Sequence, residues 1–339
     1  MPELAFFVGK GGVGKTTVSS AYAVRLAAQH PRERVLLVST DPAHSLSDLF
    51  DLRIGSSPKP IPIGERRNLT GWEIGSEHLF RTFVDARRGE LIEAVERGSL
   101  FTADEISSLL DAALPGMSEM GALLAIQEAI ASGKYSSIVV DTAPFGHTLR
   151  LFELPEQFAK VLNFLELAAE RDQVLAQHFG GTVRRDSRGF IAEWRKTLQQ
   201  VRNAFETSQL FLVTTAEEFA LNESLRCLRE MRELDPPLQL TGVILNRVGP
   251  SGSRCGSCGT RHKSTASARR RLKQGYGDTA LYLGEDPGFP IVGVHDLKKL
   301  GDSVFGKKTV VWHSRKIPAN VKATTIGKPL SGHPWPAVR

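Results

Sequence analysis

A phosphate-binding loop near the start of the chain, GKGGVGKT, limits the possible folds more than any other feature. The pattern G-x-x-x-x-G-K-[ST] is met by Gly9, Gly14, Lys15 and Thr16. An apolar run at 4–8 precedes the loop and a helical pattern follows it, which is the strand-loop-helix context that the motif requires. Glycines let backbone N–H groups turn toward a phosphate, and the helix start adds partial positive charge. We therefore predict a nucleotide site here rather than an ordinary glycine turn.

The loop also predicts individual contacts. Lys15 is expected to contact the β- and γ-phosphates of ATP, and the Thr16 hydroxyl is expected to ligate Mg²⁺. Lys10 is a second lysine that this local chemistry does not explain. The loop residues predicted to bind nucleotide are Gly9, Lys10, Gly11, Gly12, Val13, Gly14, Lys15, Thr16 and Thr17.

Apolar runs rich in β-branched residues predict five buried strands, at 4–8, 35–39, 137–140, 210–214 and 241–245. Helical patterns lie between them, as in parallel sheets whose crossover helices cover both faces. We predict an α/β fold with a doubly wound, mostly parallel sheet. Each run ends in polar residues, so the ligand is expected at the carboxyl ends of the strands.

Two long segments exceed simple crossovers, at about 76–132 and 155–206. Both have apolar residues at three- and four-residue spacing, which predicts helices. Together they are expected to form a helical subdomain inserted into a nucleotide-binding domain that spans 1–302. The remaining segment, 303–339, is predicted to be a basic, flexible tail.

Charge and hydropathy limit the location and partners of the chain. Of the net charge of +6, the tail contributes seven Lys or Arg and no Asp or Glu. Because the rest of the chain is nearly neutral, we expect no specific nucleic acid partner; contact of the tail with anionic lipid or nucleic acid is the alternative. No apolar run approaches the roughly 18 residues of a membrane span. The N-terminus lacks the features of a signal peptide, so a cytoplasmic location is expected.

Two strand-end carboxylates are candidates for the chemistry. Asp41 follows the second run in STDPAHSLSD and could orient an attacking water or help to hold a metal, although an Asp-Pro pair is equally often a turn. Asp141 ends SSIVVD, the Walker B arrangement, whose carboxylate meets Mg²⁺ directly or through its water. The alternative is that Asp141 caps the next helix. The following segment, 142–154, is expected to change shape when the γ-phosphate is lost, with Gly146 as the hinge.

Three ordered motifs, GKGGVGKTT, STDPAHSLSD and VVDTAPFGHTLRLFELP, resemble the ArsA family over about residues 4–302. That family includes the arsenite-pump ATPase and the ATPase that delivers tail-anchored membrane proteins. The resemblance implies a Mg²⁺-dependent ATPase with a deviant Walker A loop that works as a homodimer. Lys10 would cross the interface to the nucleotide of the partner subunit, as an arginine finger does in trans. Asp41 would position the attacking water, and Asp141 would belong to the Mg²⁺ shell.

The same resemblance suggests how adenine is bound. Asn246 matches the adenine-contacting asparagine of the family. Pro290 lies in the place of the second adenine-side loop, but Ile291 replaces the usual leucine of its Pro-Leu pair. Phe145 stands where a threonine is usual, so the second switch segment also departs from the family pattern.

Cys255 and Cys258 form a Cys-x-x-Cys pair, which supplies two thiolates, whereas a structural zinc site usually needs four ligands. His262 is a candidate third ligand. Two copies of the pair across a twofold axis would complete a Cys₄ site, and the targeting branch of the family shares zinc in this way at its dimer interface. A redox pair and idle thiols are the alternatives. Cys227 is expected to be a buried small hydrophobe.

The cargo has two competing predictions. In the first, helical segments of both subunits form an apolar groove that shields a transmembrane helix of a client protein. The candidate lining residues are Leu109, Met117, Met120, Leu124, Phe158, Leu162 and Leu165. Taken alone, this stripe is more typical of internal packing between helices than of a groove, and only the resemblance suggests a groove.

In the second, the chain energises an arsenite or antimonite efflux pump and binds the metalloid through thiolates. No cysteine occurs between residues 1 and 226, whereas the pump ATPase carries a metalloid cysteine in its helical region and resembles two fused copies of this unit. A single unit with a Cys-x-x-Cys pair therefore favours the targeting branch. A third alternative, a nucleotide-switched scaffold of the broader deviant-Walker class, is disfavoured by the HTLRLFELP run.

Overall fold

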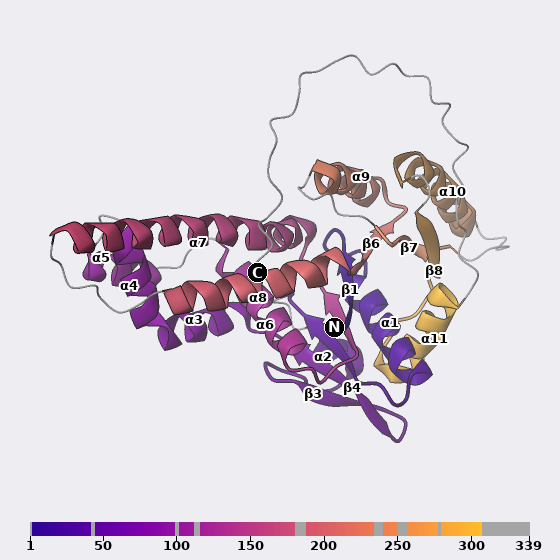
Figure 1. The fold of residues 1–339 in the computed structure, drawn as a ribbon. Helices are drawn as coiled ribbons and strands as arrows, with labels where there is room; N and C mark the ends of the chain where they lie inside the picture. Colours follow the sequence, from indigo (N-terminus) through magenta and orange to yellow (C-terminus); the bar gives the residue numbers. More distant parts are fainter. Residues whose placement is uncertain are drawn as a thin grey trace, which may run out of the picture.

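The computed structural model describes residues 2–41, 45–98, 102–111, 116–179, 188–233, 240–249, 256–276 and 279–306. Within these ranges an eight-stranded sheet has helices packed on both faces (Figure 1). The strand order is β3-β4-β2-β5-β1-β6-β7-β8, and every neighbouring pair is parallel except the β3–β4 hairpin. The predicted α/β class, with a doubly wound and mostly parallel sheet, is therefore confirmed.

The five predicted strands are present and lie next to one another in the sheet. They are β1 (Glu3–Val8), β2 (Val35–Ser39), β5 (Ser137–Asp141), β6 (Gln209–Thr215) and β7 (Gly242–Val248). Three further strands, β3 (Lys59–Ile63), β4 (Arg66–Glu73) and β8 (Ala280–Glu285), extend the sheet on both sides. β3 and β4 were not predicted, because β3 contains two prolines and β4 begins with charged residues. Prolines are tolerated in β3 because it is an edge strand.

The first strand shows how the sheet is buried on both faces. Leu4, Phe6 and Val8 belong to one core cluster, and Ala5 and Phe7 belong to the other. Such alternation between two cores explains why the run reads as continuously apolar. The face with Phe7 is covered by α1 (Lys15–Gln29), α2 (Ser45–Phe50) and α11 (Gly293–Phe305). The face with Phe6 is covered by α6 to α10.

The two long segments contain helices, as predicted. The first holds α3 (Ser76–Ala86), α4 (Arg88–Gly98), α5 (Ala103–Asp111) and α6 (Met117–Ala131). The second holds α7 (Phe145–Phe179) and α8 (Arg188–Glu206), which run side by side in Figure 1. The remaining helices are α9 (Glu218–Glu233) and α10 (Gly256–Tyr276). The start of α7 differs from expectation: Pro155 lies inside the helix, so α7 begins only four residues after Asp141.

The outer part of the helical subdomain has a small core of its own. Leu162 from α7 packs with Ile191, Trp194 and Leu198 from α8, separately from the two sheet cores. Phe83 from α3 meets the Trp194 ring edge-on at 5.1 Å between centroids. Contacts between α3 and α6 are so close that a Cβ atom at Gly121 would lie 1.7 Å from the Ser76 carbonyl oxygen. The helices are therefore tied to one another as well as to the sheet.

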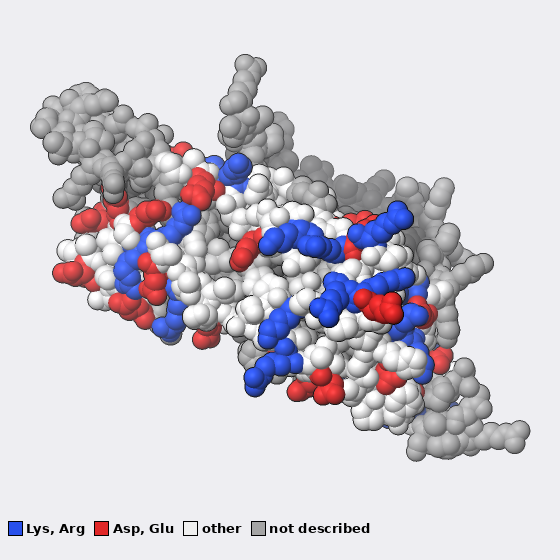
Figure 2. Space-filling view, turned by 90° about the horizontal axis from the view of Figure 1, so that it is seen from below, with Lys and Arg blue, Asp and Glu red and all other residues white. Residues whose placement is uncertain are grey.

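Charged side chains of both signs are interspersed on the face shown in Figure 2, with acidic residues gathered toward the end formed by α4 and α5. The predicted tail lies outside the described residues from 307 onward, and the lack of a nucleic acid partner stays a prediction. Across the described ranges, none of the helices combines the length and the apolar character needed to cross a bilayer.

Candidate nucleotide site

The phosphate loop connects β1 to α1 through glycines that the local geometry demands. Gly9 has φ 152°, and a Cβ atom there would lie 2.2 Å from the Val213 carbonyl oxygen of the neighbouring strand β6. Gly14 has φ 91° and is the N-cap residue of α1, which begins at Lys15. Side chains other than hydrogen are therefore excluded at Gly9 by contact and disfavoured at Gly14 by backbone conformation. Thr16 and Thr17 lie in the first turn of α1, where N–H groups are available to a phosphate.

Lys15, the first residue of α1, is buried where the loop ends, with 5% of its surface exposed. Its Nζ donates a hydrogen bond to the carbonyl oxygen of Lys10 at 3.2 Å. Burial lowers the pKa of Lys15, while the charges of Asp141 and Asp41 act in the opposite direction. The structure thus brings the loop lysine and both predicted carboxylates into one electrostatic environment, although the three residues come from different segments of the chain.

Asp141 is fully buried at the end of β5. Its Oδ2 accepts a hydrogen bond from the Ser39 hydroxyl at 3.2 Å, and its Oδ1 has no partner among the described residues. Burial raises the pKa of Asp141 to about 6, although the hydrogen bond with Thr16 and the charge of Lys15 act to lower it. A buried carboxylate oxygen without a partner is costly unless a donor or a cation meets it.

The oxygen atoms around Asp141 fit a hard divalent cation. Thr16 acts to lower the pKa of the Asp141 carboxyl, and the Thr16 hydroxyl oxygen accepts a hydrogen bond from the Ser45 hydroxyl at 3.3 Å. Magnesium prefers oxygen ligands and is usually held by one or two protein groups together with phosphates and water. The unpartnered Oδ1 of Asp141 is the observation that makes the site suitable for Mg²⁺ or one of its waters.

Asp41 lies where β2 ends, beside the same group of residues. Its backbone N–H donates to the Ser39 hydroxyl at 3.3 Å. The preceding residue, Thr40, joins two strand ends: its N–H donates to the Asp141 carbonyl oxygen at 2.9 Å, and its hydroxyl accepts from the Ala143 N–H at 3.0 Å. This network holds Asp41 and the segment after Asp141 in a fixed relation. Ser39, Thr40 and Ser45 were not predicted as site residues, although each is a hydroxyl at a strand or helix end.

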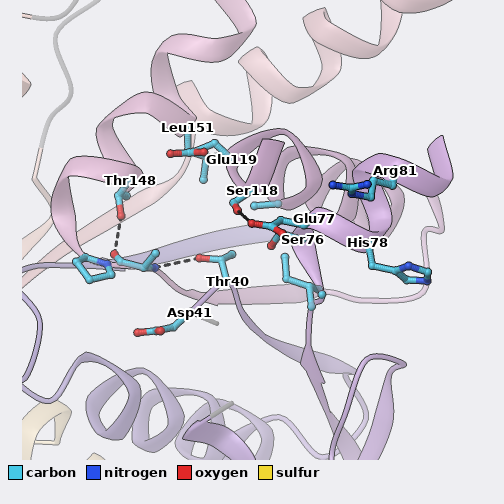
Figure 3. Close-up of a pocket in the computed structure, with 15 residues that line it drawn as sticks. Thr40, Asp41, Ser76, Glu77, His78, Arg81, Ser118, Glu119, Thr148 and Leu151 are labelled. Carbon is cyan, nitrogen blue, oxygen red and sulfur yellow. Dashed lines mark hydrogen bonds between the residues drawn. The ribbon is translucent and has the colours of Figure 1, made fainter. Parts of the chain in front are cut away.

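A cavity of about 840 Å³ adjoins Asp41 on the side of the helical subdomain. In Figure 3, Asp41 lies on one side of the cavity, and Glu119 of α6 and Leu151 of α7 lie across from it. Glu119 is buried and 4.0 Å from the Arg150 guanidinium. The lining residues are Thr40, Asp41, Ile74, Gly75, Ser76, Glu77, His78, Arg81, Ser118, Glu119, Ala122, Ala143, Pro144, Thr148 and Leu151. The cavity therefore links the nucleotide edge of the sheet to α3, α6 and α7.

The second lysine of the loop points elsewhere. The Lys10 ammonium lies over the ring of Phe219, 3.8 Å from the ring centroid, in a cation–π contact with the start of α9. The backbone of Lys10 faces the loop, since its carbonyl oxygen accepts from Lys15. Phe219 is a residue that the sequence did not suggest, because no local pattern relates it to the loop.

Asn246 is buried at the end of β7, where its Nδ2 donates to the Val13 carbonyl oxygen at 2.9 Å. The predicted adenine residue therefore also fixes the shape of the phosphate loop in this structure. Pro290 is exposed in the segment between β8 and α11. β7 and β8 are parallel neighbours; Asn246 lies near the carboxyl end of β7, and the segment with Pro290 follows the end of β8. Their contacts with adenine stay a prediction.

Most of the predicted groove residues are not exposed in this structure. Met117, Met120 and Leu162 are buried, and Leu124 and Phe158 are half-buried. Leu109 and Leu165 lie in described helices, but their side chains are outside the described part. Among the side chains of α7 that the structure describes, the exposed large apolar ones are instead Phe164, at 56%, and Leu167, at 66%.

The zinc prediction falls mostly outside the described residues. Cys255 is not described, and Cys258 lies in the first turn of α10 with an undescribed side chain. His262 is exposed on the same helix. Cys227 is buried, as predicted, and burial raises the pKa of its thiol. The described residues contain no group of three or more His, Cys, Asp or Glu side chains that could hold a metal ion.

Comparison with known proteins agrees with this geometry. The sequence model of a family described as anion-transporting ATPases matches residues 3–306. An ATPase GET3 of Scheffersomyces stipitis is 29% identical over 314 residues, which cover 87% of each chain. An ATPase GET3 of Debaryomyces hansenii is 30% identical over 317 residues, again 87% of each chain. An ATPase ASNA1 homolog of Entamoeba dispar is 29% identical over 291 residues, or 81% of this chain and 85% of the relative.

The raised pKa of Asp141 predicts a pH-dependent stability for the protein free of nucleotide and metal. The folded pKa of about 6 exceeds the ordinary aspartate pKa of 3.8, so the folded state binds this proton more tightly than the unfolded state. The free energy of unfolding should therefore fall as the pH rises from about 4 to about 6. Asp141→Asn should remove this loss and raise the free energy of unfolding at pH 7.5 by up to roughly 3 kcal/mol.

Urea unfolding in EDTA between pH 4 and pH 8 measures this difference. The exposed Asp104→Asn in α5 is the matched control, because it makes the same chemical change away from the site. Parallel pH profiles for the wild type and Asp141→Asn would show that the Asp141 carboxylate is not held at a raised pKa.

Proposed function

This chain belongs to the anion-transporting ATPase family and is an ATPase, and we propose that it is a homodimeric switch that delivers tail-anchored membrane proteins. The observation that carries the nucleotide part of this proposal is the meeting of Lys15, Asp141 and Asp41 at one edge of the sheet. The family resemblance of the three sequence motifs carries the client part. The family has two known branches. Membrane-protein targeting is the leading proposal for this chain, and arsenite export is the alternative.

Each residue of the site has a defined task in the proposed hydrolysis of ATP to ADP and phosphate. The N–H groups of the loop surround the phosphates, and Lys15 contacts the β- and γ-phosphates. Thr16 and Asp141 hold Mg²⁺, which neutralises charge on the phosphates. Burial of Asp141 supports this task, because an ionised carboxylate at that position needs a compensating positive charge.

Asp41 is proposed to orient the attacking water and to accept its proton. It is half-buried and lies close enough to Lys15 for the two charges to interact, which places it beside the phosphate loop. Hydrogen bonds of its neighbours Ser39 and Thr40 to Asp141 fix the end of β2 relative to the metal-binding carboxylate. A positioned carboxylate of this kind typically contributes a factor of about 10² to 10⁴ to the rate.

Lys10 is proposed to act in trans. Its side chain points away from the buried Lys15 ammonium and toward α9, so it does not add to the phosphate contacts within its own loop. A cation directed outward from the site can neutralise transition-state charge on the nucleotide of a second subunit. Hydrolysis would then require that two subunits close on each other, which makes the homodimer the active species.

Substitutions separate these two tasks from nucleotide binding. Asp41→Asn should retain ATP affinity within a few-fold and reduce kcat at least about 100-fold, because the water loses its acceptor. Lys10→Ala should likewise lower kcat far more than ATP affinity. Fluorescent-nucleotide titration and phosphate-release kinetics measure the two quantities, with the exposed Asp51→Asn and Lys134→Ala as matched controls. An unaltered rate in Asp41→Asn would remove Asp41 from this role, and equal losses of affinity and rate in Lys10→Ala would make it a local phosphate ligand.

A change of the bound nucleotide can be transmitted to the helices through the short segment between Asp141 and α7. Ala143 and Pro144 come two and three residues after Asp141 and line the cavity beside Asp41, and α7 begins at the next residue. Thr148 in the first turn of α7 donates to the Ala143 carbonyl oxygen at 2.8 Å. We propose that loss of the γ-phosphate shifts this segment and thereby moves α7 against α6 around the cavity. The predicted hinge, Gly146, lies in the same turn.

The client is proposed to be an apolar transmembrane helix held between the helical subdomains of two subunits. Phe164 and Leu167 of α7 offer exposed apolar surface for such a contact. Leu162 and Met120, which belong to the predicted lining, are packed in internal cores of the described chain. They would reach the client only after α7 and α8 separate, so the proposed groove depends on the nucleotide-driven movement of α7.

Client capture can be tested directly against the arsenite alternative. The full chain is mixed with a detergent-free single-span peptide and ATP, and separately with arsenite or antimonite, and ATPase rate and dimer content are measured in each case. Capture of the peptide in a soluble dimer, lost in Phe164→Asp/Leu167→Asp, is the expected result. Lys160→Gln on the same helix is the control for changes to an exposed residue. Stimulation by the metalloid without peptide capture would favour the pump function and contradict the targeting proposal.

Zinc is proposed to join the two subunits through Cys255 and Cys258. Two chains each supply two thiolates, and a Cys₄ set is a usual structural zinc site. The purified dimer should therefore contain about one zinc per two chains, and Cys255→Ser should lose the metal and weaken the dimer. Metal analysis and analytical ultracentrifugation measure both effects, with Cys227→Ala as the control thiol. A zinc-free dimer that Cys255→Ser does not alter would contradict the shared site.

A further inference from the structure

We propose that the Lys10 ammonium rests on the ring of Phe219. The ring holds the ammonium against α9 until the lysine moves to a nucleotide of a second subunit. The distance of 3.8 Å from Nζ to the ring centroid is well within the range of a cation–π contact. This inference deepens the proposed role of Lys10 in trans and rests on it. Phe219 is accordingly a positioning residue, since it contacts the lysine and not the substrate.

The contact follows from the order of the strands. β1 and β6 are parallel neighbours, so the loop after β1 and the start of the helix after β6 emerge at the same edge of the sheet. Gly9 lies so close to β6 that a Cβ atom would meet the Val213 carbonyl oxygen at 2.2 Å. The next residue, Lys10, turns its carbonyl oxygen toward Lys15 and its side chain toward Phe219. The loop backbone is thus directed inward and the Lys10 ammonium outward.

The start of α9 is held in place for this contact. Arg271 of α10 donates to both carboxylate oxygens of Glu218, at 2.7 and 2.9 Å, and also hydrogen-bonds the Asn222 side chain. The same arginine lowers the pKa of Glu218, mainly through this hydrogen bond. Glu218, the acidic residue next to Phe219, is therefore engaged by α10. The aromatic ring, which is 64% exposed, remains available to Lys10.

The cation–π contact is weak enough for Lys10 to bind the ring reversibly. An exposed cation–π pair of this type favours the docked state about two- to fivefold, which thermal motion overcomes easily. A nucleotide phosphate with its full negative charge is a stronger partner for an ammonium than the face of a ring. Phe219 would keep Lys10 away from the phosphates of its own loop and release it when a closed dimer presents the phosphates of another.

The experiment uses a series of ring substitutions in the full chain. Phe219→Leu keeps the apolar bulk but removes the π face, and Phe219→Trp strengthens the cation–π contact. The lysines are ¹³C-methylated by reductive methylation, which keeps their charge, and the Lys10 signal is assigned by its disappearance in Lys10→Arg. The methyl signal of Lys10 should show an upfield ring-current shift in the nucleotide-free wild type, lose it in Phe219→Leu and keep it in Phe219→Trp. Lys134 provides the internal reference.

The same variants are then assayed for ATP hydrolysis at limiting protein concentration. The rate should rise about two- to fivefold in Phe219→Leu and fall below the wild-type rate in Phe219→Trp. Both effects should disappear in a Lys10→Met background, whereas an effect of Phe219 on the dimer interface itself would persist there. If Phe219→Leu does not change the Lys10 signal, the docked position is wrong. If the wild type, Phe219→Leu and Phe219→Trp hydrolyse ATP at the same rate, the docked position has no effect on hydrolysis.

These readouts distinguish failure of the inference from failure of the proposed function. If Lys10→Ala hydrolyses ATP at the wild-type rate, the role of Lys10 in trans is wrong, and the effect of Phe219 on turnover falls with it. The ring-current shift in the nucleotide-free protein would then still report whether Lys10 rests on Phe219. If Lys10→Ala is inactive but the shift is absent, the role in trans stands and the resting position is wrong.

Discussion

The arrangement of the nucleotide site depends on one buried carboxylate. Asp141 ends a strand that is covered on both sides, and one of its oxygens has no hydrogen-bond partner in the described structure. Such a group is tolerated only where positive charge compensates it, and the loop lysine Lys15 supplies part of that charge. The central position of β5, between β1 and β2, brings the loop, Asp41 and the start of α7 around the same carboxylate. Binding of a nucleotide with a metal ion at this carboxylate would therefore relieve an unfavourable burial that the fold itself creates.

Sequence patterns were sufficient for those parts of the fold that repeat a simple local rule. The phosphate loop and the five central strands follow from a motif and from apolar runs, because strands buried on both faces tolerate few polar residues. Strands β3 and β4 could not be predicted in this way. Pro60 and Pro62 are allowed because β3 is an edge strand, and the charged start of β4 precedes its pairing with β2, which begins at Leu69. The extent of α7 was also hidden, because Pro155 is usually incompatible with a helix interior.

Contacts between distant segments account for most of what the sequence did not predict at the site. Lys10 and Phe219 are far apart in the chain and meet only because β1 and β6 are neighbours. Asn246 donates to the backbone of Val13, so the fifth residue of the loop is held by a residue of β7. Neither relation has a local signature, whereas Lys15 and Asp141 were identified from their immediate surroundings. Residue types that carry chemistry can thus be predicted more readily than the side chains that hold them in position.

The separate core of the helical subdomain has a consequence for how the molecule moves. Four buried side chains, with Trp194 among them, hold the outer parts of α7 and α8 together, whereas the two sheet cores are much larger. Amides in a region with so little buried apolar surface exchange with solvent through local openings well below the global free energy of unfolding. We therefore expect the outer parts of these helices to rearrange while the sheet stays intact. A single chain can therefore combine a rigid nucleotide site on the sheet with outer helices that move easily.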